Sequence, residues 1–189
     1  YGADAELVAG MGDGYTGFWA DLDCGPGPVT AFRFDMDCNE VAECAEESHR
    51  PVREGFASRW PGLMHACGHD GHAAVGLGLA EVLVSIRRHL RGRIRLIFQP
   101  AEEGTRGALP MSEAGAVDGV DVLFGFHIGF KAEGPGTLIC GTQGFLATTK
   151  RDVLFSGVPA HAGAAPEEGK DALLAACSAV VNLHAISRN

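Results

Sequence analysis

The sequence predicts an α/β fold, a sheet whose strands are connected by helical crossovers. Three observations predict it: short apolar runs alternate with longer segments of helical periodicity, glycines gather at the joints between them, and side chains able to do chemistry follow the ends of the predicted strands. Glycine accounts for 27 of 189 residues, about twice its usual share, as expected for a chain with many tight reversals.

The first three elements follow from local patterns. Residues 15–22 (YTGFWADL) and 29–34 (VTAFRF) are predicted to be neighbouring strands, joined by a turn-rich segment. From His72 the apolar residues recur at helical spacing as far as Leu90, and Gly92 ends the pattern, so a helix is predicted there.

Strands and helices then continue to alternate. Residues 93–98 (RIRLIF) are predicted to form a strand, residues 106–116 a helix and residues 121–128 (DVLFGFHI) another strand, and 136–141 is a candidate further strand. This order implies crossover connections within one sheet.

A change of pattern near residue 145 predicts a domain boundary, with one domain over residues 1–145 and the start of a second over 146–189. Residues 151–156 (RDVLFS) alternate like a strand, and residues 171–186 have helical periodicity. The chain begins without Met and ends just after that helix, which suggests a fragment of a longer protein.

Composition excludes several classes of protein. Apolar residues make up 46% and charged residues 21%, as in a folded protein rather than a disordered one. With 24 acidic residues against 15 Lys and Arg, the net charge of −9 argues against a nucleic-acid or anionic-membrane partner. The apolar runs are far shorter than the roughly 20 residues of a membrane span. Six scattered cysteines without a C-x-x-C pair indicate a reducing compartment, and we expect a cytoplasmic protein.

The densest group of chemically active side chains is HACGHDGH, residues 65–72. Thiolate and imidazole are good ligands for zinc and similar divalent ions, and Cys67 and His69 lie two apart on a predicted turn, so both can face one site. The alternative is a helix-capping loop in which Asp70 is the cap and the histidines only form hydrogen bonds.

Two acidic pairs follow predicted strands. Glu102 and Glu103 come after RIRLIF, where open α/β sheets place their sites. Neighbouring side chains on an extended chain diverge, so one can bind a metal while the other faces the attacking water. Asp35 and Asp37 follow VTAFRF and can bind a metal or orient a ligand. A solvated acidic turn is the alternative for each pair, and it is the commoner case for an isolated Glu-Glu.

His127 lies near the end of DVLFGFHI, where a lone histidine is more often a satisfied core residue. Taken together, however, the candidate ligands are expected at one edge of one sheet. This arrangement favours a binuclear metal site in which the glutamate that does not bind metal acts as general base.

His161, in GVPAHAG, cannot be placed near that site by local reasoning. The sequence contains no GxSxG, no P-loop and no GxGxxG after a strand.

Five motifs in order, RFDMD, MHACGHDGH, IFQPAEEG, FHI and GVPAHAG, resemble the aminoacylase and carboxypeptidase family of two-metal exopeptidases. Within it they are similar to the amidohydrolase branch, and SHRPVREGFAS, LIFQPAEEGTRGA and AHAGAAPEEGKDALLAA are closest to members that act on p-aminobenzoyl-glutamate. The resemblance covers nearly the whole chain except about the first dozen residues.

The resemblance implies a zinc-exopeptidase-like catalytic domain with the start of an inserted ferredoxin-like lid that mediates dimerisation. It implies two divalent ions, Mn or Zn, on four matched ligands: Cys67, His69, Glu103 and His127. Glu102 matches the general base, Asp37 the acidic residue that supports the site, and His161 the lid histidine that reaches the substrate carbonyl.

The implied reaction is hydrolysis of an amide bond by a metal-activated water. p-Aminobenzoyl-glutamate is the first expected substrate, and other N-acyl amino acids of the hippurate or indole-acetyl type are the alternative. The protein is expected to pair with itself or with a related second chain.

Two features depart from the family. Asp35 stands where other branches carry a metal-binding His, and the chain ends before the family's last His ligand, so we expect this fragment alone to be inactive. A non-catalytic partner of the same fold and a structural metal site are the other hypotheses, and the presence of Glu102 favours catalysis.

Overall fold

The computed structural model describes residues 16–129, 134–144 and 151–186, and the chain divides into two compact units, Tyr1–Phe145 and Leu146–Asn189, each described by itself. Among the described residues, none of the helices has the length and apolar content that a membrane crossing requires. The first unit contains strands β1 (Phe18–Asp23), β2 (Val29–Asp35), β3 (Arg93–Gln99) and β4 (Val122–Gly125), helices α2 (Arg50–Arg53), α3 (His69–Ile86) and α4 (Ala108–Glu113), and a 3-10 helix, Arg87–His89.

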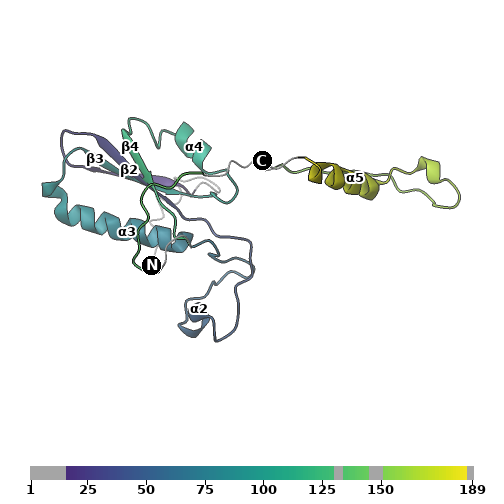
Figure 1. The fold of residues 1–189 in the computed structure, drawn as a ribbon, viewed down its shortest axis with the longest axis horizontal. Coiled ribbons are helices and arrows are strands. Elements are labelled where there is room, and N and C mark those ends of the chain that lie inside the picture. Colours follow the sequence, from purple (N-terminus) through teal and green to yellow (C-terminus); the bar gives the residue numbers. More distant parts are fainter. Residues whose placement is uncertain (1–15, 130–133, 145–150, 187–189) are drawn as a thin grey trace. The chain divides into compact units, whose positions relative to one another are not determined.

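A four-stranded sheet in the order β1-β3-β2-β4 organises the first unit (Figure 1). Strand β2 runs parallel to both β3 and β4, whereas β1 runs antiparallel to β3. The α/β prediction is therefore confirmed. The prediction that β1 and β2 are neighbours is wrong, because β3 lies between them; β3 is buried after its first residue, which suits an interior strand.

Apolar clusters cover the two faces of the sheet. On one face Phe98 packs with Leu83 of α3, and on the other Ile97 packs with Met111 of α4. Adjacent residues of β3 thus point to opposite faces, as the pleat of a strand requires. Gly76 lets α3 approach the sheet closely, because a Cβ there would lie 2.8 Å from the ring of Phe98.

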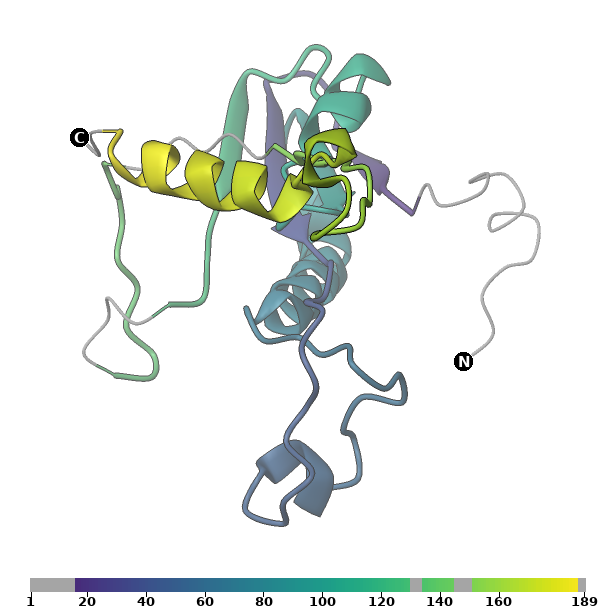
Figure 2. The same cartoon turned by 90° about the vertical axis from the view of Figure 1, so that its right-hand side faces the viewer.

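The helix predicted from His72 begins three residues earlier, at His69. Gly68 precedes it with φ of 87°, a left-handed conformation that glycine adopts without strain. This early start places His69 on the first turn of α3. Helix α2, which the sequence did not predict, lies midway along the long loop between β2 and α3, at the part of the loop that is away from the sheet in both views (Figures 1 and 2).

Several predicted boundaries change. Tyr15 of the first predicted strand lies outside the described residues, and β4 ends at Gly125 rather than at residue 128. No strand forms in residues 136–141 or 151–156, so both strand predictions are wrong for the described chain. An alternating pattern alone does not make a strand, since its backbone groups need a hydrogen-bonded partner and the described residues provide none there.

The second unit contains a 3-10 helix (Pro166–Glu168) and helix α5 (Ala172–His184), close to the helix predicted over residues 171–186. Asp171 caps α5, its Oδ1 accepting a hydrogen bond of 2.8 Å from the backbone N–H of Leu174. A backbone bridge between Val158 and Lys170 closes the segment that contains His161.

Strand β4 forms one edge of the sheet, since it pairs only with β2 among the described residues. Its apolar side chains are not covered: Val122, Leu123 and Phe124 are 46%, 51% and 52% exposed. This edge therefore combines unpaired backbone groups with uncovered apolar side chains.

A buried arginine links β1 and the segment that follows α4 to the centre of the sheet. Arg95 of β3 donates from Nε and Nη2 to the two carboxylate oxygens of Asp21, at 2.7 and 2.8 Å. Its Nη1 donates to the carbonyl of Ala116 at 3.0 Å, and its guanidinium lies over the ring of Trp19. The hydrogen bond from Arg95 is the main reason why the pKa of Asp21 is below its usual value.

Replacing this arginine should loosen the sheet. We expect Arg95→Met to lower the free energy of unfolding by about 2–4 kcal/mol, because it leaves the Asp21 carboxylate and the carbonyls that follow α4 without their donor. Arg91→Met, at an exposed position, is the matched control. The pKa of Asp21 is lower in the folded protein, so the Asp21 contribution is complete above the unfolded-state value and is lost as the pH falls through the folded value. Urea unfolding at pH 7 and at pH 3 measures the effect of the substitution and its pH dependence. Equal free energies of unfolding for Arg95→Met and Arg91→Met would contradict a stabilising role for Arg95.

Candidate metal centre

The carboxyl ends of three strands meet at one edge of the sheet. Because β2, β3 and β4 are parallel, the loops that follow them leave from the same edge, where open α/β sheets place their sites. The β2 loop carries Asp37, the β3 loop carries Glu102 and Glu103, and the β4 loop carries His127. The N-terminal turn of α3 brings His69 to the same place.

His69 is the centre of this group. Its side chain is fully buried, and Nδ1 lies 3.0 Å from the backbone oxygen of Asp37 and 3.2 Å from Asp37 Oδ1, so Nδ1 carries the proton and donates. Nε2 then presents a lone pair, and among the described residues it has no hydrogen-bond partner. A carboxylate-held imidazole with a free nitrogen is the usual form of a metal-binding histidine, and a buried acceptor without a partner is otherwise costly.

Three groups of possible metal donors share His69: one contains Asp35 and His72, and the other two contain the expected ligands. Of these two, Cys67, His69 and His127 form one group, and His69, Glu102 and Glu103 form the other; within each group the donor atoms lie within 4.8 Å of one another. The Cys67 sulfur is 3.4 Å from His127 Nε2, and His69 Nε2 is 3.9 Å from Glu102 Oε2. Sulfur, imidazole and carboxylate together suit divalent ions such as Zn²⁺, so these side chains fit a metal.

The structure thus brings together all five side chains expected in the metal site or as its base: Cys67, His69, Glu102, Glu103 and His127. Asp37, the expected supporting residue, holds His69 through Nδ1 and accepts a hydrogen bond of 3.0 Å from the Glu103 backbone N–H. It therefore fastens two of the expected ligands.

His161 belongs to the second unit and is described only with its neighbours there. Its Nδ1 accepts hydrogen bonds from the backbone N–H groups of Gly163 and Ala164, at 3.1 and 3.0 Å. In the neutral ring this leaves the proton on Nε2, which is exposed and able to donate.

The two adjacent glutamates lie in a strained turn rather than on the extended chain that the sequence suggested. Ala101 and Thr105 flank them with φ of 52° and 53°, a left-handed conformation that costs a non-glycine residue about 1 kcal/mol or more. The Thr105 N–H donates to the Glu102 carbonyl at 2.8 Å, which closes the turn. Non-glycine residues held in this conformation are characteristic of functional sites.

A second buried histidine, His72, was part of the HACGHDGH cluster but was not expected to have a role of its own. Its Nδ1 donates to Asp35, and its Nε2 accepts from the Ile128 backbone N–H at 2.9 Å, next to His127. Arg33 pairs with the other Asp35 oxygen at 2.7 Å. Burial raises the pKa of Asp35, but the hydrogen bond from His72 and the charge of Arg33 lower it by more, so Asp35 is a carboxylate. The signal available in the sequence was the i, i+3 spacing of His69 and His72 on one helix face.

A further residue, Asn39, was missed altogether. Its side chain bonds both to the loop that carries Cys67 and to Glu103. A loop asparagine has no periodicity or motif that would mark it in a single sequence.

The surroundings of Cys67 keep its thiol protonated in the absence of a cation. Desolvation comes first among the causes, followed by the carboxylate of Glu103 and the charges of Glu102 and Asp35, and together they raise the pKa of Cys67 to about 11. Since metals bind the thiolate, a bound cation must displace this proton.

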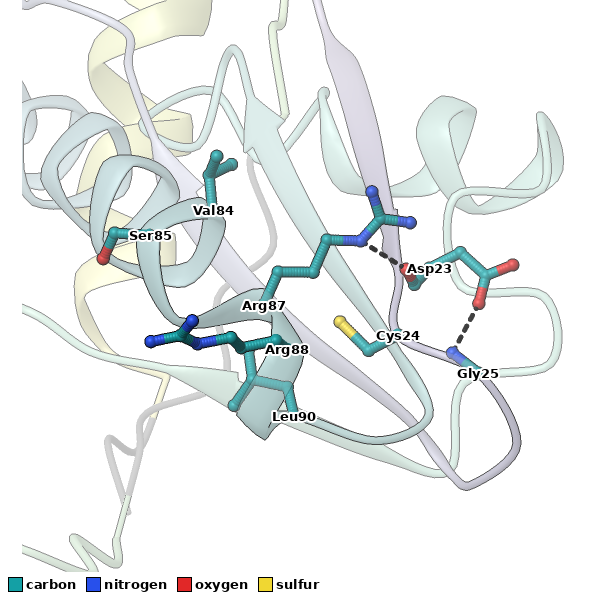
Figure 3. A pocket seen from close by; sticks show the side chains of 8 residues that line it. All are labelled: Asp23, Cys24, Gly25, Val84, Ser85, Arg87, Arg88 and Leu90. Carbon is teal, nitrogen blue, oxygen red and sulfur yellow. Dashed lines mark hydrogen bonds between the residues drawn. The ribbon is translucent and has the colours of Figure 1, made fainter.

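A hollow of about 910 Å³ lies elsewhere, at the C-terminal end of α3 (Figure 3). At 1.5 Å of rise per residue, this end of the helix is roughly 20 Å from His69. None of the donor side chains described above lines it, and so it is separate from the candidate metal centre. Its lining residues are Asp23, Cys24, Gly25, Val84, Ser85, Arg87, Arg88 and Leu90.

The fold and the donor cluster together define an α/β protein with a candidate metal centre of sulfur, nitrogen and carboxylate donors at the carboxyl edge of its sheet. The profile of peptidase family M20/M25/M40 matches residues 31–185, and the chain belongs to this family. The family resemblance stated from the five motifs is thereby confirmed.

Relatives with known names are similar over nearly the whole chain. A p-aminobenzoyl-glutamate hydrolase subunit of Escherichia coli is 56% identical over 98% of the chain, and the indole-3-acetyl-aspartic acid hydrolase of Enterobacter agglomerans is 55% identical over 98%. Each match covers 43% of the relative, so the chain spans less than half the length of these curated relatives.

Solved structures are similar as well. The aminobenzoyl-glutamate utilization protein of Klebsiella pneumoniae is 45% identical with a TM-score of 0.73, covering 100% of this chain and 41% of that one. The YXEP protein of Bacillus subtilis, described as a dinuclear metal-binding peptidase of the M20 family, is 42% identical with a TM-score of 0.53, covering 60% of this chain and 30% of that one.

Metal uptake should release the Cys67 proton. At pH 7 we expect Zn²⁺ loading to release about one proton more from the wild type than from Cys67→Ser, because the thiol is protonated before binding. A pH indicator in weak buffer measures the difference. Cys44→Ser, which alters an exposed thiol, should match the wild type, and equal release from all three proteins would show that Cys67 is not a ligand.

Removing the imidazole of His72 should destabilise the site from within. We expect His72→Leu to lower the free energy of unfolding by about 2–4 kcal/mol, because Asp35 remains buried and loses a hydrogen-bond donor. Chemical denaturation of the metal-free protein measures this, with His89→Leu, at an exposed position, as the control. If the two variants were equally stable, the hydrogen bonds of His72 to Asp35 and Ile128 would not contribute to the stability of the protein.

Proposed function

We propose that the protein carrying this chain is a metal-dependent amidohydrolase that splits p-aminobenzoyl-glutamate into p-aminobenzoate and glutamate. The observation that carries the proposal is the unpartnered, buried Nε2 of His69 beside Glu102, within a cluster that also contains Cys67, Glu103 and His127. The names of the E. coli and K. pneumoniae relatives support the choice of substrate.

Two divalent ions, Zn²⁺ or Mn²⁺, would be held by Cys67, His69, Glu103 and His127. The dinuclear centre named for the B. subtilis relative supports a pair of ions, of which the single lone pair of His69 Nε2 would bind one. When bound, the ions acidify a water molecule and polarise the scissile carbonyl.

The side chains around them divide the remaining work. Glu102, partly exposed and adjacent to His69 Nε2, takes the proton of the water and passes it to the leaving amine. Asp37 keeps His69 in the tautomer whose Nε2 can bind metal. His161, with its Nε2–H free to donate, stabilises the negative charge that develops on the carbonyl oxygen.

The two units would have separate tasks. Residues 1–145 would be part of the catalytic domain and residues 146–189 the start of a lid that also mediates dimerisation, either as a homodimer or as a heterodimer with a related chain. The division of the chain after Phe145 supports the boundary, and the word subunit in the name of the E. coli relative supports an assembly. The cytoplasmic location stays a prediction.

A second substrate class has a specific observation in its favour. The indole-3-acetyl-aspartic acid hydrolase is 55% identical, almost as similar as the first relative. Both named substrates join an aromatic acyl group to an acidic amino acid through an amide bond, so the same chemistry at the centre would cleave either. A non-catalytic partner of this fold remains the other candidate, but the retention of Glu102 together with the clustered donors favours an enzyme.

Replacing the general base tests the proposal. In the protein expressed from its complete gene, we expect Glu102→Gln to lower kcat for release of glutamate by about 10²–10⁴-fold while the metals remain bound, since an amide cannot accept the proton. Glu113→Gln, at an exposed position on α4, should keep full activity. Indole-3-acetyl-aspartate and hippurate serve as comparison substrates, and their relative kcat/KM assigns the acyl group.

Two outcomes would count against it. If Glu102→Gln cleaved as fast as the wild type, Glu102 would not be the base. If the metal-loaded wild type cleaved none of the three amides, a non-catalytic role in an assembly would be the better interpretation.

A further inference from the structure

We propose that Asn39 is a positioning residue that ties the Cys67 loop to Glu103 and so fixes the relative placement of two metal-binding side chains. This inference rests on the proposed function, because it takes Cys67 and Glu103 as ligands. It goes further by assigning a task to a side chain that is neither a ligand nor a base.

Both polar atoms of the Asn39 side-chain amide form hydrogen bonds. Its Nδ2 donates to Glu103 Oε1 at 2.8 Å, while its Oδ1 accepts from the backbone N–H groups of Ala66 at 3.1 Å and Cys67 at 3.2 Å. The orientation of the amide follows from these partners: the opposite orientation would turn the NH₂ group towards two N–H donors and the oxygen towards a carboxylate. One planar group therefore connects two loops that are far apart in the sequence.

The backbone holds Asn39 itself in place. Its N–H donates to the Met64 carbonyl at 2.8 Å, and its carbonyl accepts from the Met64 N–H at 3.1 Å, which closes the long loop that contains α2. The side chain thus projects from a fixed point. Consequently the position of Cys67, three residues after Met64, depends on Asn39 through both its backbone and its side chain.

Asn39 and Asp37 act on Glu103 from the same segment. Asp37 accepts from the Glu103 backbone N–H at 3.0 Å, and Asn39 donates to the Glu103 side chain. Asp37 also holds His69, and Asn39 also holds the backbone of Cys67. The two residues together fix three of the proposed ligands, so the segment after β2 acts as the frame of the centre.

The chemistry of the amide suits this task. A leucine of similar size would leave the Ala66 and Cys67 N–H groups without their acceptor and release the Glu103 carboxylate. An aspartate would keep both bonds from the loop, but it would lose the donor to Glu103 and set a second carboxylate against it. Comparing the two substitutions therefore separates the hydrogen bonds that Asn39 accepts from the Cys67 loop from the hydrogen bond that it donates to Glu103.

The experiment compares Asn39→Leu, Asn39→Asp and a control in the protein expressed from its complete gene. The control is Asn182→Leu, which removes an asparagine whose side chain donates to the Ser178 carbonyl in the second unit. Co²⁺ is the probe: chelator competition gives its affinity, and the thiolate-to-Co²⁺ absorption band reports the bond to Cys67. Steady-state kinetics with p-aminobenzoyl-glutamate give kcat and KM separately.

For Asn39→Leu we expect Co²⁺ affinity about 10- to 100-fold lower, a weaker thiolate band and a lower kcat. For Asn39→Asp we expect the thiolate band to persist, because the loop keeps its acceptor, while kcat falls by about tenfold or more with little change in KM. Asn182→Leu should resemble the wild type in every measurement.

The proposal is overturned if Asn39→Leu binds Co²⁺ with wild-type affinity and a wild-type band, or if Asn39→Asp keeps the wild-type kcat. A loss of thermal stability with unchanged affinity and spectrum would also overturn it, because it would make Asn39 a structural residue only. If the wild type binds Co²⁺ but cleaves no amide, the proposed function fails, and the affinity and spectrum of Asn39→Leu still decide the case of Asn39.

Discussion

The parallel pairing of β2 with both β3 and β4 is the constraint on which the candidate metal centre depends. Parallel strands end at the same edge, so three loops that are distant in sequence begin within one small region. The register shows that β2 and β3 end side by side, because their last residues, Asp35 and Gln99, are paired. Helix α3 adds its first turn at the same edge, and farther along the helix Gly76 allows α3 to pack closely on Phe98.

The centre is built so that its supporting bonds, more than its donors, define its geometry. His69 belongs to all three groups of possible donors, and its tautomer is set by Asp37. Asp35, His72 and the Ile128 backbone form a second chain of hydrogen bonds that ends next to His127. Several carboxylates approach one another here, which is unfavourable unless a cation balances their charge, and the raised pKa of Cys67 is in part a consequence of that crowding.

Local patterns in the sequence predicted the donors but not the bonds that hold them. Cys67, His69 and the Glu102–Glu103 pair were candidates because they follow a strand end or precede a helix, whereas the full set with His127 came from the family resemblance. The partners of His72 and Asn39 lie 37 and 64 residues away in the sequence; the i, i+3 spacing from His69 was the only local signal for His72, and Asn39 had none. The neighbour relation of β1 and β2 failed for the same reason: strand order depends on which strand is apolar on both faces. The strand expected over residues 151–156 failed because alternation predicts a strand only where a partner exists.

The uncovered edge at β4 leaves the sheet open to extension. A strand that, in the described part of the chain, pairs on one side only and whose side chains are about half exposed offers backbone groups on which another strand can add. Pairing β4 with a further strand, or covering it, would close this edge and bury the side chains of Val122, Leu123 and Phe124.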